Sequence, residues 1–302
     1  MNALGGAPRV PALRRVNALT VDVEDYFQVQ SLSSAYNRST WDACEGRVER
    51  NVDRLLELFD HGAARATFFT LGWIAERHKP MMRRIASAGH EIASHGYCHE
   101  RVDRQSPVLF REDVRRTKAI LEGCTGTPVR GYRAATFSIG PTTQWAFRIL
   151  EEEGHAYSSS VHPVRHDNYS FPEAPRFAYR PAGTFRFWEI PITTVRLAGH
   201  NFACGGGGYF RLFPYLLSRA ALAHVNLSDN QPIVFYLHPW EIDPDQPRPA
   251  GVPLKSRLRH YLNLAQTEPR LVRLLRDFSW SRIDRVFTEL SAPELARRAQ
   301  NA

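Results

Sequence analysis

The chain has 302 residues, of which 43% are hydrophobic and 23% are charged, a balance that is ordinary for a globular protein. No stretch approaches the ~20 consecutive apolar residues of a membrane span, so we expect no transmembrane segment. The formal charge of +8 favours anionic partners. The arginines are scattered, however, and no nucleic-acid-binding motif accompanies them, so we expect a solvated basic surface and no nucleic-acid partner.

The predicted strands and helices alternate along the chain. Apolar residues recurring on one face predict a helix over residues 47–59, after a buried strand at 17–23. Further strands are predicted at residues 66–70, 90–94, 129–133, 188–192 and 232–237. Further helices are predicted at residues 80–88, 106–121, 142–153, 209–224, 271–278 and 283–290. This alternation predicts a parallel sheet covered by helices, which is an α/β fold.

The segment between residues 158 and 208 departs from this alternation. It holds several prolines and a run of four glycines at 205–208, so we expect long loops around the strand at 188–192. The glycine run is open to two interpretations, a loop that shapes a binding pocket or a plain flexible loop. No internal repeat or linker stands out, and we therefore predict one domain spanning residues 1–302.

The cysteines and the first residues bear on the location of the protein. The four cysteines form no CxxC pair, so each is expected to be a reduced thiol. Residues 1–16 carry arginines and proline but no apolar segment long enough for a signal peptide. We therefore expect a cytoplasmic protein, and the sequence leaves its oligomeric state open.

Four polar residues each fall at or just past the carboxyl end of a predicted strand. They are Asp22, His95, Arg133 and His238. In parallel α/β folds the carboxyl ends of the strands lie on one edge of the sheet, and active sites are built there. The sequence therefore predicts that these side chains meet in one site.

The residue types at these positions predict a catalytic metal site. His95 and His99 are spaced by one helical turn, so both imidazoles can face one ion. Asp22 and Glu24 share a strand face, whereas Asp25 points elsewhere unless the strand has already ended, and could instead cap a helix. One carboxylate can bind the metal while another accepts a proton from water. Three protein ligands would leave room for water and substrate.

Arg133 and His238 complete this predicted site. Arg133 would pair with the proton-accepting carboxylate and fix its orientation; its other interpretation is a structural ion pair at a strand end. His238 follows a rigid buried strand and could protonate a leaving amine near neutral pH. Its other interpretation is a histidine satisfied within the core.

These segments resemble the polysaccharide deacetylase family, also called the NodB-homology family or carbohydrate esterase family four. The matching motifs are Thr20-Val21-Asp22, Ser94-His95-Gly96-Tyr97-Cys98-His99, Arg133 with the residues that follow it, and Leu237-His238. The resemblance implies a distorted (β/α) barrel with long inserted loops, a core over about residues 16–245 and a C-terminal helical extension over about 246–302. It implies Asp22 as general base, His238 as general acid and the backbone N–H of Thr136 as an oxyanion donor.

A closer resemblance is to the subfamily associated with exosortase and exopolysaccharide loci. It is carried by residues 22–29, 131–139, 206–211, 237–241 and 260–264. The implied activity is removal of N-acetyl groups from hexosamines of an exopolysaccharide or of its lipid-linked precursor, so an acetylated polysaccharide or oligosaccharide is the expected substrate. Zinc is the expected metal, although a site with one oxygen and two nitrogen ligands also accepts nickel or cobalt.

The chain departs from the commoner family pattern at two points. Val23 stands where that pattern has a metal-binding aspartate, so Glu24 or Asp25 would be the third metal ligand. No aspartate–tryptophan motif is evident between Arg133 and His238. Two alternatives therefore stay open: an allantoinase-like amidohydrolase acting on a small cyclic amide, and a catalytically silent glycan-binding relative.

Overall fold

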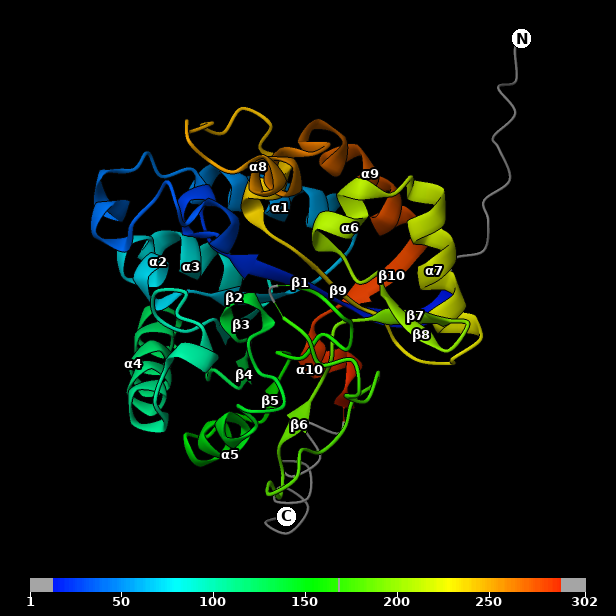
Figure 1. The fold of residues 1–302 in the computed structure, drawn as a ribbon, viewed down its shortest axis with the longest axis horizontal. Helices are drawn as coiled ribbons and strands as arrows, with labels where there is room; N and C mark the ends of the chain where they lie inside the picture. The colour runs from blue at the N-terminus through cyan, green and yellow to red at the C-terminus, as the bar shows by residue number, and fades with distance from the viewer. Residues whose placement is uncertain (1–12, 168, 289–302) are drawn as a thin grey trace.

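A curled parallel sheet forms the centre of the molecule in this computed structural model, which describes residues 13–167 and 169–288 (Figure 1). The strands follow the order β10-β1-β2-β3-β4-β5-β6, and β9 also pairs with β1. Each of these pairings is parallel. The strands are β1 Leu13–Val23, β2 Thr67–Thr70, β3 Glu91–Ser94, β4 Gly131–Tyr132, β5 Tyr157–Ser158, β6 Trp188–Glu189, β9 Val234–Leu237 and β10 Phe278–Ser281.

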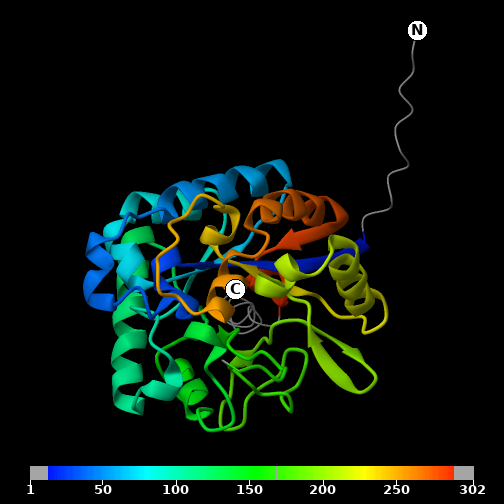
Figure 2. The ribbon, with the colours of Figure 1, turned by 45° about the horizontal axis from the view of Figure 1, so that its top comes forward.

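Helices lie around the outside of the curled sheet, as Figures 1 and 2 show. They are α1 Val48–His61, α2 Gly72–Arg77, α3 Lys79–Ser87, α4 Pro107–Thr125, α5 Trp145–Glu152, α6 Gly207–Leu212, α7 Tyr215–Leu227, α8 Leu254–Tyr261, α9 Leu264–Asp277 and α10 Ile283–Val286. None of the described helices is both long enough and apolar enough to cross a membrane. The arrangement confirms the predicted distorted (β/α) barrel.

Strand β1 shows how the sequence builds this barrel. Leu19, Val21 and Val23 are fully buried and belong to the cluster that includes the apolar residues of the helices. The intervening residues, Ala18 and Asp22 among them, face the opposite side of the sheet because side chains alternate along a strand. Burying each large aliphatic side chain stabilises the fold by roughly 1.5–3 kcal/mol. The outer face therefore anchors the strand, and the inner face is left for polar residues.

The row of strands nearly closes on itself through the segment that follows β6. Thr193 N–H donates to the carbonyl of Val234 at 3.4 Å, and Tyr236 N–H donates to the carbonyl of Gly205 at 2.8 Å. These contacts place the glycine run directly against β9. The run is therefore a close backbone contact rather than a plain flexible loop.

Replacing Gly206 by alanine is expected to lower the free energy of unfolding by about 3 kcal/mol. Gly206 has a φ of +118°, and a Cβ atom there would lie 1.9 Å from the backbone oxygen of Tyr236. Gly208→Ala is the matched control, because its Cβ would meet Arg211 at an ordinary 3.9 Å. Urea unfolding of the two variants measures the difference. Equal loss of stability in both would contradict this account of the contact.

Two predicted segments differ from the structure. The helix predicted over 209–224 is divided into α6 and α7, because Pro214 cannot donate a backbone hydrogen bond within a continuous helix. The loops predicted over 158–208 contain an antiparallel hairpin, β7 Thr194–Leu197 and β8 His200–Ala203. Its strands are too short to give a clear alternating pattern. The predicted helix at 283–290 is confirmed over α10, and its last two residues lie outside the described chain.

Candidate metal centre and active site

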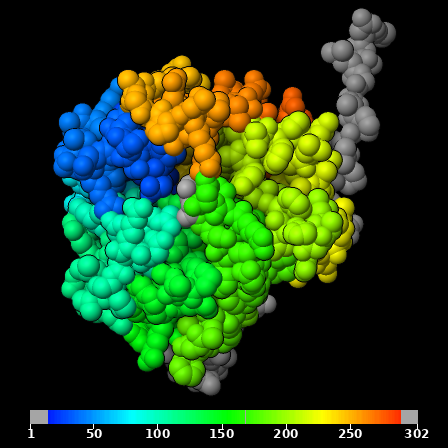
Figure 3. Space-filling model, viewed as in Figure 1, coloured from blue at the N-terminus to red at the C-terminus, as the bar shows by residue number. Residues whose placement is uncertain are grey.

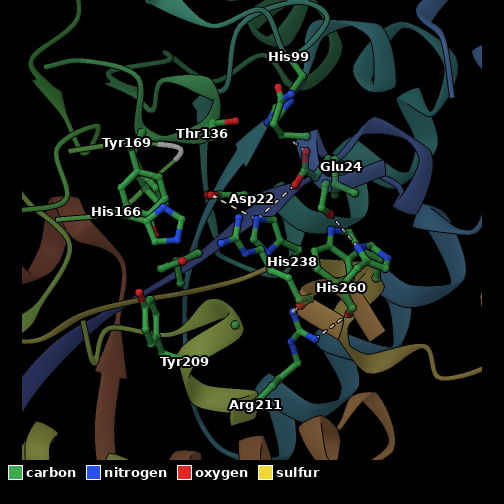
Figure 4. Close-up of a pocket in the computed structure, with 18 of the residues that line it drawn as sticks. Asp22, Glu24, His99, Thr136, His166, Tyr169, Tyr209, Arg211, His238 and His260 are labelled. Atoms are coloured by element: carbon green, nitrogen blue, oxygen red, sulfur yellow. Dashed lines mark hydrogen bonds and ion pairs between the residues drawn. The ribbon is translucent and has the colours of Figure 1, made fainter. Parts of the chain in front are cut away.

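A cavity of about 440 Å³ opens where β1, β3 and β9 end. Six of the predicted site residues line it: Asp22, Glu24, His95, His99, Thr136 and His238 (Figure 4). Arg133 lies directly behind Asp22 and is fully buried. The structure therefore brings together the residues that follow the strand ends, as their placement in the sequence predicted.

Glu24, His95 and His99 form a buried group that could hold a metal ion. One ligand atom from each residue lies within 4.8 Å of the others, and His99 Nε2 is 3.2 Å from Glu24 Oε2. His95 Nδ1 donates to the backbone carbonyl of Arg133 at 2.8 Å, which leaves Nε2 as the free ligand atom. A carboxylate and two imidazoles are a common donor set for a catalytic zinc.

The protonation of this group also suits a cation. Burial lowers the pKa of His95, and burial together with the adjacent His95 holds the pKa of His99 well below its usual range. Both imidazoles are therefore neutral, as metal ligands must be. Burial raises the pKa of Glu24 to about 7, and its Oε2 accepts no hydrogen bond from the described residues. A bound cation would supply the missing partner.

The two histidines converge by a different route from the one predicted. Residues 95–99 form an irregular turn and not a helical turn. Gly96 and His99 both adopt left-handed backbone conformations, with φ of 74° and 55°. Non-glycine residues rarely adopt this conformation, and such strain is concentrated at functional sites. Asp113 on α4 fixes the turn by accepting from Tyr97 N–H at 3.1 Å.

Asp25 lies outside the group, although the sequence left it as an alternative to Glu24. Its carboxylate accepts hydrogen bonds from the backbone N–H groups of Tyr26, Arg47 and Val48 at 2.6–2.8 Å. Two of these groups belong to the start of α1, whose first N–H groups have no partner within the helix. Asp25 is thus committed to capping α1, and the carboxylate that faces the histidines is that of Glu24.

Arg133 fixes the orientation of Asp22. Its Nη1 donates to Asp22 Oδ1 at 2.5 Å and to Thr20 Oγ1 at 2.8 Å. Its other nitrogens donate to the backbone oxygen and the hydroxyl of Ser159, both at 2.9 Å. Asp22 Oδ2 is left toward the cavity, 4.0 Å from His238 Nε2. The buried arginine thus holds one oxygen of Asp22 and leaves the other available.

A chain of buried charges holds His238. Its Nδ1 contacts Glu241 Oε1 at 2.6 Å, and Glu241 Oε2 accepts from Arg211 Nε at 2.8 Å. Burial opposes protonation of His238, but the Glu241 hydrogen bond and the charge of Glu24 raise its pKa to about 9. Burial likewise opposes ionisation of Glu241, yet Arg211 and His238 lower its pKa to about 2. His238 is therefore cationic at neutral pH, with Nε2 directed into the cavity.

Glu241 and Arg211 were not assigned roles from the sequence. Arg211 also donates to the backbone carbonyls of Arg259, His260 and Leu262 at 2.7–3.0 Å, around the end of α8. The three-residue spacing of His238 and Glu241 was the available signal for their contact. Nothing local in the sequence indicates that Arg211 reaches them.

Thr136 lines the cavity from a tight turn after β4. Thr136 and Phe137 adopt φ values of 55° and 49°. Across the cavity from Glu24 and His99 lies an aromatic wall formed by His166, Tyr169 and Tyr209 (Figure 4). The rings of His166 and Tyr169 stack with centroids 4.2 Å apart. The cavity therefore has a polar end, where Glu24, His95 and His99 lie, and an end lined by aromatic side chains.

Comparison with known proteins agrees with this geometry. Residues 35–157 match the family model described as Polysaccharide deacetylase, and residues 159–288 match a domain of unknown function (DUF3473). A peptidoglycan deacetylase-like protein of Gibberella zeae is 32% identical over 118 residues, covering 38% of this chain and 33% of that protein. The peptidoglycan deacetylase of Helicobacter pylori is 27% identical over 122 residues, covering 40% of each chain.

The chain thus spans only about a third to two fifths of the length of these curated relatives. A solved structure covers far more of it: a candidate polysaccharide deacetylase from Mycobacterium smegmatis shares its fold with a TM-score of 0.60 at 19% identity, over 97% of this chain and 96% of that one. The matched family segment contains both histidines of the metal-ligand group and Arg133. Over residues 35–157 the chain is therefore similar to polysaccharide deacetylases, and its fold is shared along nearly the whole length of the solved structure.

Proposed function

We propose that this protein is a metal-dependent deacetylase that removes N-acetyl groups from hexosamine units of an exopolysaccharide or of its lipid-linked precursor. The observation that carries the proposal is the convergence of a carboxylate–histidine group, Glu24, His95 and His99, with Asp22 and His238 in one cavity. The matched relatives are named as deacetylases of peptidoglycan and chitooligosaccharides, which supports an acetylated glycan as substrate. The aromatic wall supports a substrate with sugar rings to place against it.

The donor set fits a divalent metal, with zinc as the expected ion and nickel or cobalt as substitutes. Glu24, His95 and His99 would hold it. When bound, such an ion supplies a Lewis acid that polarises the acetyl carbonyl and makes water more acidic. Because all three ligands are buried at the end of rigid strands or a fixed turn, the acetyl group would be presented in one orientation.

The remaining residues move the protons. Asp22 Oδ2 accepts the proton of the water that adds to the carbonyl carbon, while Arg133 keeps Asp22 aligned. The backbone N–H of Thr136 donates to the oxygen that becomes negative. His238 Nε2 donates a proton to the sugar nitrogen as the C–N bond breaks. The products are acetate and a free amine.

Acetate release from N-acetylglucosamine oligomers tests the function. We expect release by the purified protein, loss of release after a chelator removes bound metal, and recovery when zinc, nickel or cobalt is added back. Circular dichroism before and after chelation controls for unfolding. Full activity in a sample shown by elemental analysis to hold no metal would refute the metal role. Absence of acetate release from every acetylated glycan, by a folded metal-loaded protein, would refute the function.

A further inference from the structure

Helix α8 exposes apolar side chains to solvent and buries a polar one, the reverse of an ordinary surface helix. A surface helix usually turns its apolar stripe toward the core. In α8, Leu254 and Leu258 are 69% and 57% exposed, whereas His260 is buried. The His260 ring stacks on Trp240 at 4.2 Å, and its Nε2 lies 2.6 Å from Gln246 Oε1. The polar side of α8 is therefore its anchored side, and its leucines are left in solvent.

The junction of α6 and α7 repeats this inversion. Leu216 and Leu217 in α7 are 74% and 60% exposed, although Arg211 in α6 is buried in its ion pair with Glu241. Leu212 and Phe213, which directly precede Pro214 between the two helices, are also exposed. Two separate segments thus expose large apolar side chains to solvent.

The two segments come together at the mouth of the cavity. Leu212 and Leu258 both line it, one from each segment. In Figure 3 the two segments, coloured yellow-green and orange, stand next to each other on the face toward the viewer. We call this surface the apolar rim; it consists of Leu212, Phe213, Leu216, Leu217, Leu254 and Leu258. A gathering of exposed large apolar side chains of this kind marks an interaction site.

Basic residues are interleaved with the leucines of the apolar rim. Lys255, Arg257 and Arg259 occupy α8 between and beside Leu254 and Leu258. Asp167 is paired with both Lys255 and Arg259, at 2.6 and 3.0 Å. Asp167 thus pairs with two of the three cations of α8, and the rim keeps an excess of positive charge next to its apolar side chains.

We propose that the apolar rim docks on the surface of an anionic lipid bilayer. Leucines that insert among acyl chains, with lysine and arginine at the level of the headgroups, are the combination that such a surface binds. A second copy of the chain related by a two-fold axis through α8 would place cationic α8 against cationic α8. A glycan, neutral or acidic, offers no acyl chains among which the exposed leucines could insert. The proposal goes beyond the deacetylation proposed above and does not depend on it.

Docking in this orientation would set the cavity mouth against the bilayer. Leu212 and Leu258 belong to both the rim and the cavity lining. The cavity would therefore lead from the lipid surface to Glu24. A sugar carried by a lipid would then enter the site without leaving the membrane surface.

Vesicle flotation of the full chain tests the docking. We expect the protein to float with vesicles of phosphatidylcholine and phosphatidylglycerol, and to float poorly with phosphatidylcholine alone or in high salt. The variant Leu216→Ser/Leu254→Ser should lower the partition coefficient about tenfold, because two apolar side chains no longer insert. The matched control is Val108→Ser/Leu227→Ser, which removes two equally exposed apolar side chains from α4 and the far end of α7 and should float like the wild type.

Each outcome decides the proposal. Equal flotation of Leu216→Ser/Leu254→Ser and wild type, or no flotation of wild type, would overturn it. Self-association in the ultracentrifuge that the same variant abolishes, without vesicle binding, would also overturn it and identify a second copy as the occupant. Acetate release from a water-soluble oligosaccharide should be unchanged in Leu216→Ser/Leu254→Ser, since neither residue lines the cavity. Failure of docking is thereby distinguishable from failure of the proposed activity.

Discussion

Replacing Asp22 by asparagine should reduce the rate of acetate release by roughly 10³-fold. Asparagine keeps the shape of the side chain and an oxygen that can accept from Arg133, but it cannot take a proton from water. The substitution also removes the charge that balances the fully buried Arg133, and breaking such a pair costs about 3–5 kcal/mol of stability. Rates should therefore be measured at a temperature where the variant is folded, and normalised to the folded fraction.

Asp243→Asn is the matched control for this loss of activity. Asp243 is also a buried carboxylate paired with arginine, at 2.7 Å from Arg47, but it does not line the cavity. Its asparagine variant should lose stability and keep its rate per folded molecule. If Asp22→Asn retained a rate within tenfold of the wild type, Asp22 would not be the proton acceptor.

Replacing Glu24 by glutamine is expected to weaken zinc binding at least ~100-fold, whereas Asp25→Asn should leave zinc affinity unchanged. Glu24 is the carboxylate that faces the histidines, and its burial already disfavours its charged form when no cation is present. Glutamine loses the anionic ligand and should leave the metal-free fold at least as stable. Calorimetric titration with zinc measures the affinities.

The free energy of unfolding should change in the opposite order, with the larger loss in Asp25→Asn. Asp25 caps α1 through the N–H groups of Arg47 and Val48, and weakening this cap should lower the free energy of unfolding by about 1 kcal/mol. A variant pair in which Asp25→Asn lost zinc and Glu24→Gln kept it would reverse the assignment of the third ligand.

The sequence predicted those residues of the site that lie at the ends of strands. Asp22, His95 and His238 each follow a short apolar run, and the geometry of a parallel sheet then places them on one edge. The parallel sheet covered by helices followed from the alternation of predicted strands and helices, whereas its curling into a distorted barrel was implied by the family resemblance. These features depend on local patterns, and local patterns are visible in one sequence.

Contacts between distant segments could not be predicted in this way. The choice between Glu24 and Asp25 is made by backbone N–H groups of α1, more than twenty residues later, which engage Asp25 and leave Glu24 to the cavity. The convergence of His95 and His99 depends on two residues with left-handed backbone conformations. The spacing of the two histidines predicted a helical turn instead, because backbone conformation cannot be read from spacing alone. The hairpin β7–β8 was missed because its four-residue strands are defined by pairing with each other.

Arg211 connects the C-terminal segment to the candidate site. One guanidinium group holds Glu241, and through it His238, while satisfying backbone carbonyls around the end of α8. A shortened chain without α8 would leave a buried cation with only half of its acceptors, and His238 would lose its rigid support. A chain that lacked this segment would have to hold an imidazole at the position of His238 by another route, so the C-terminal segment and the end of β9 depend on each other through one guanidinium group.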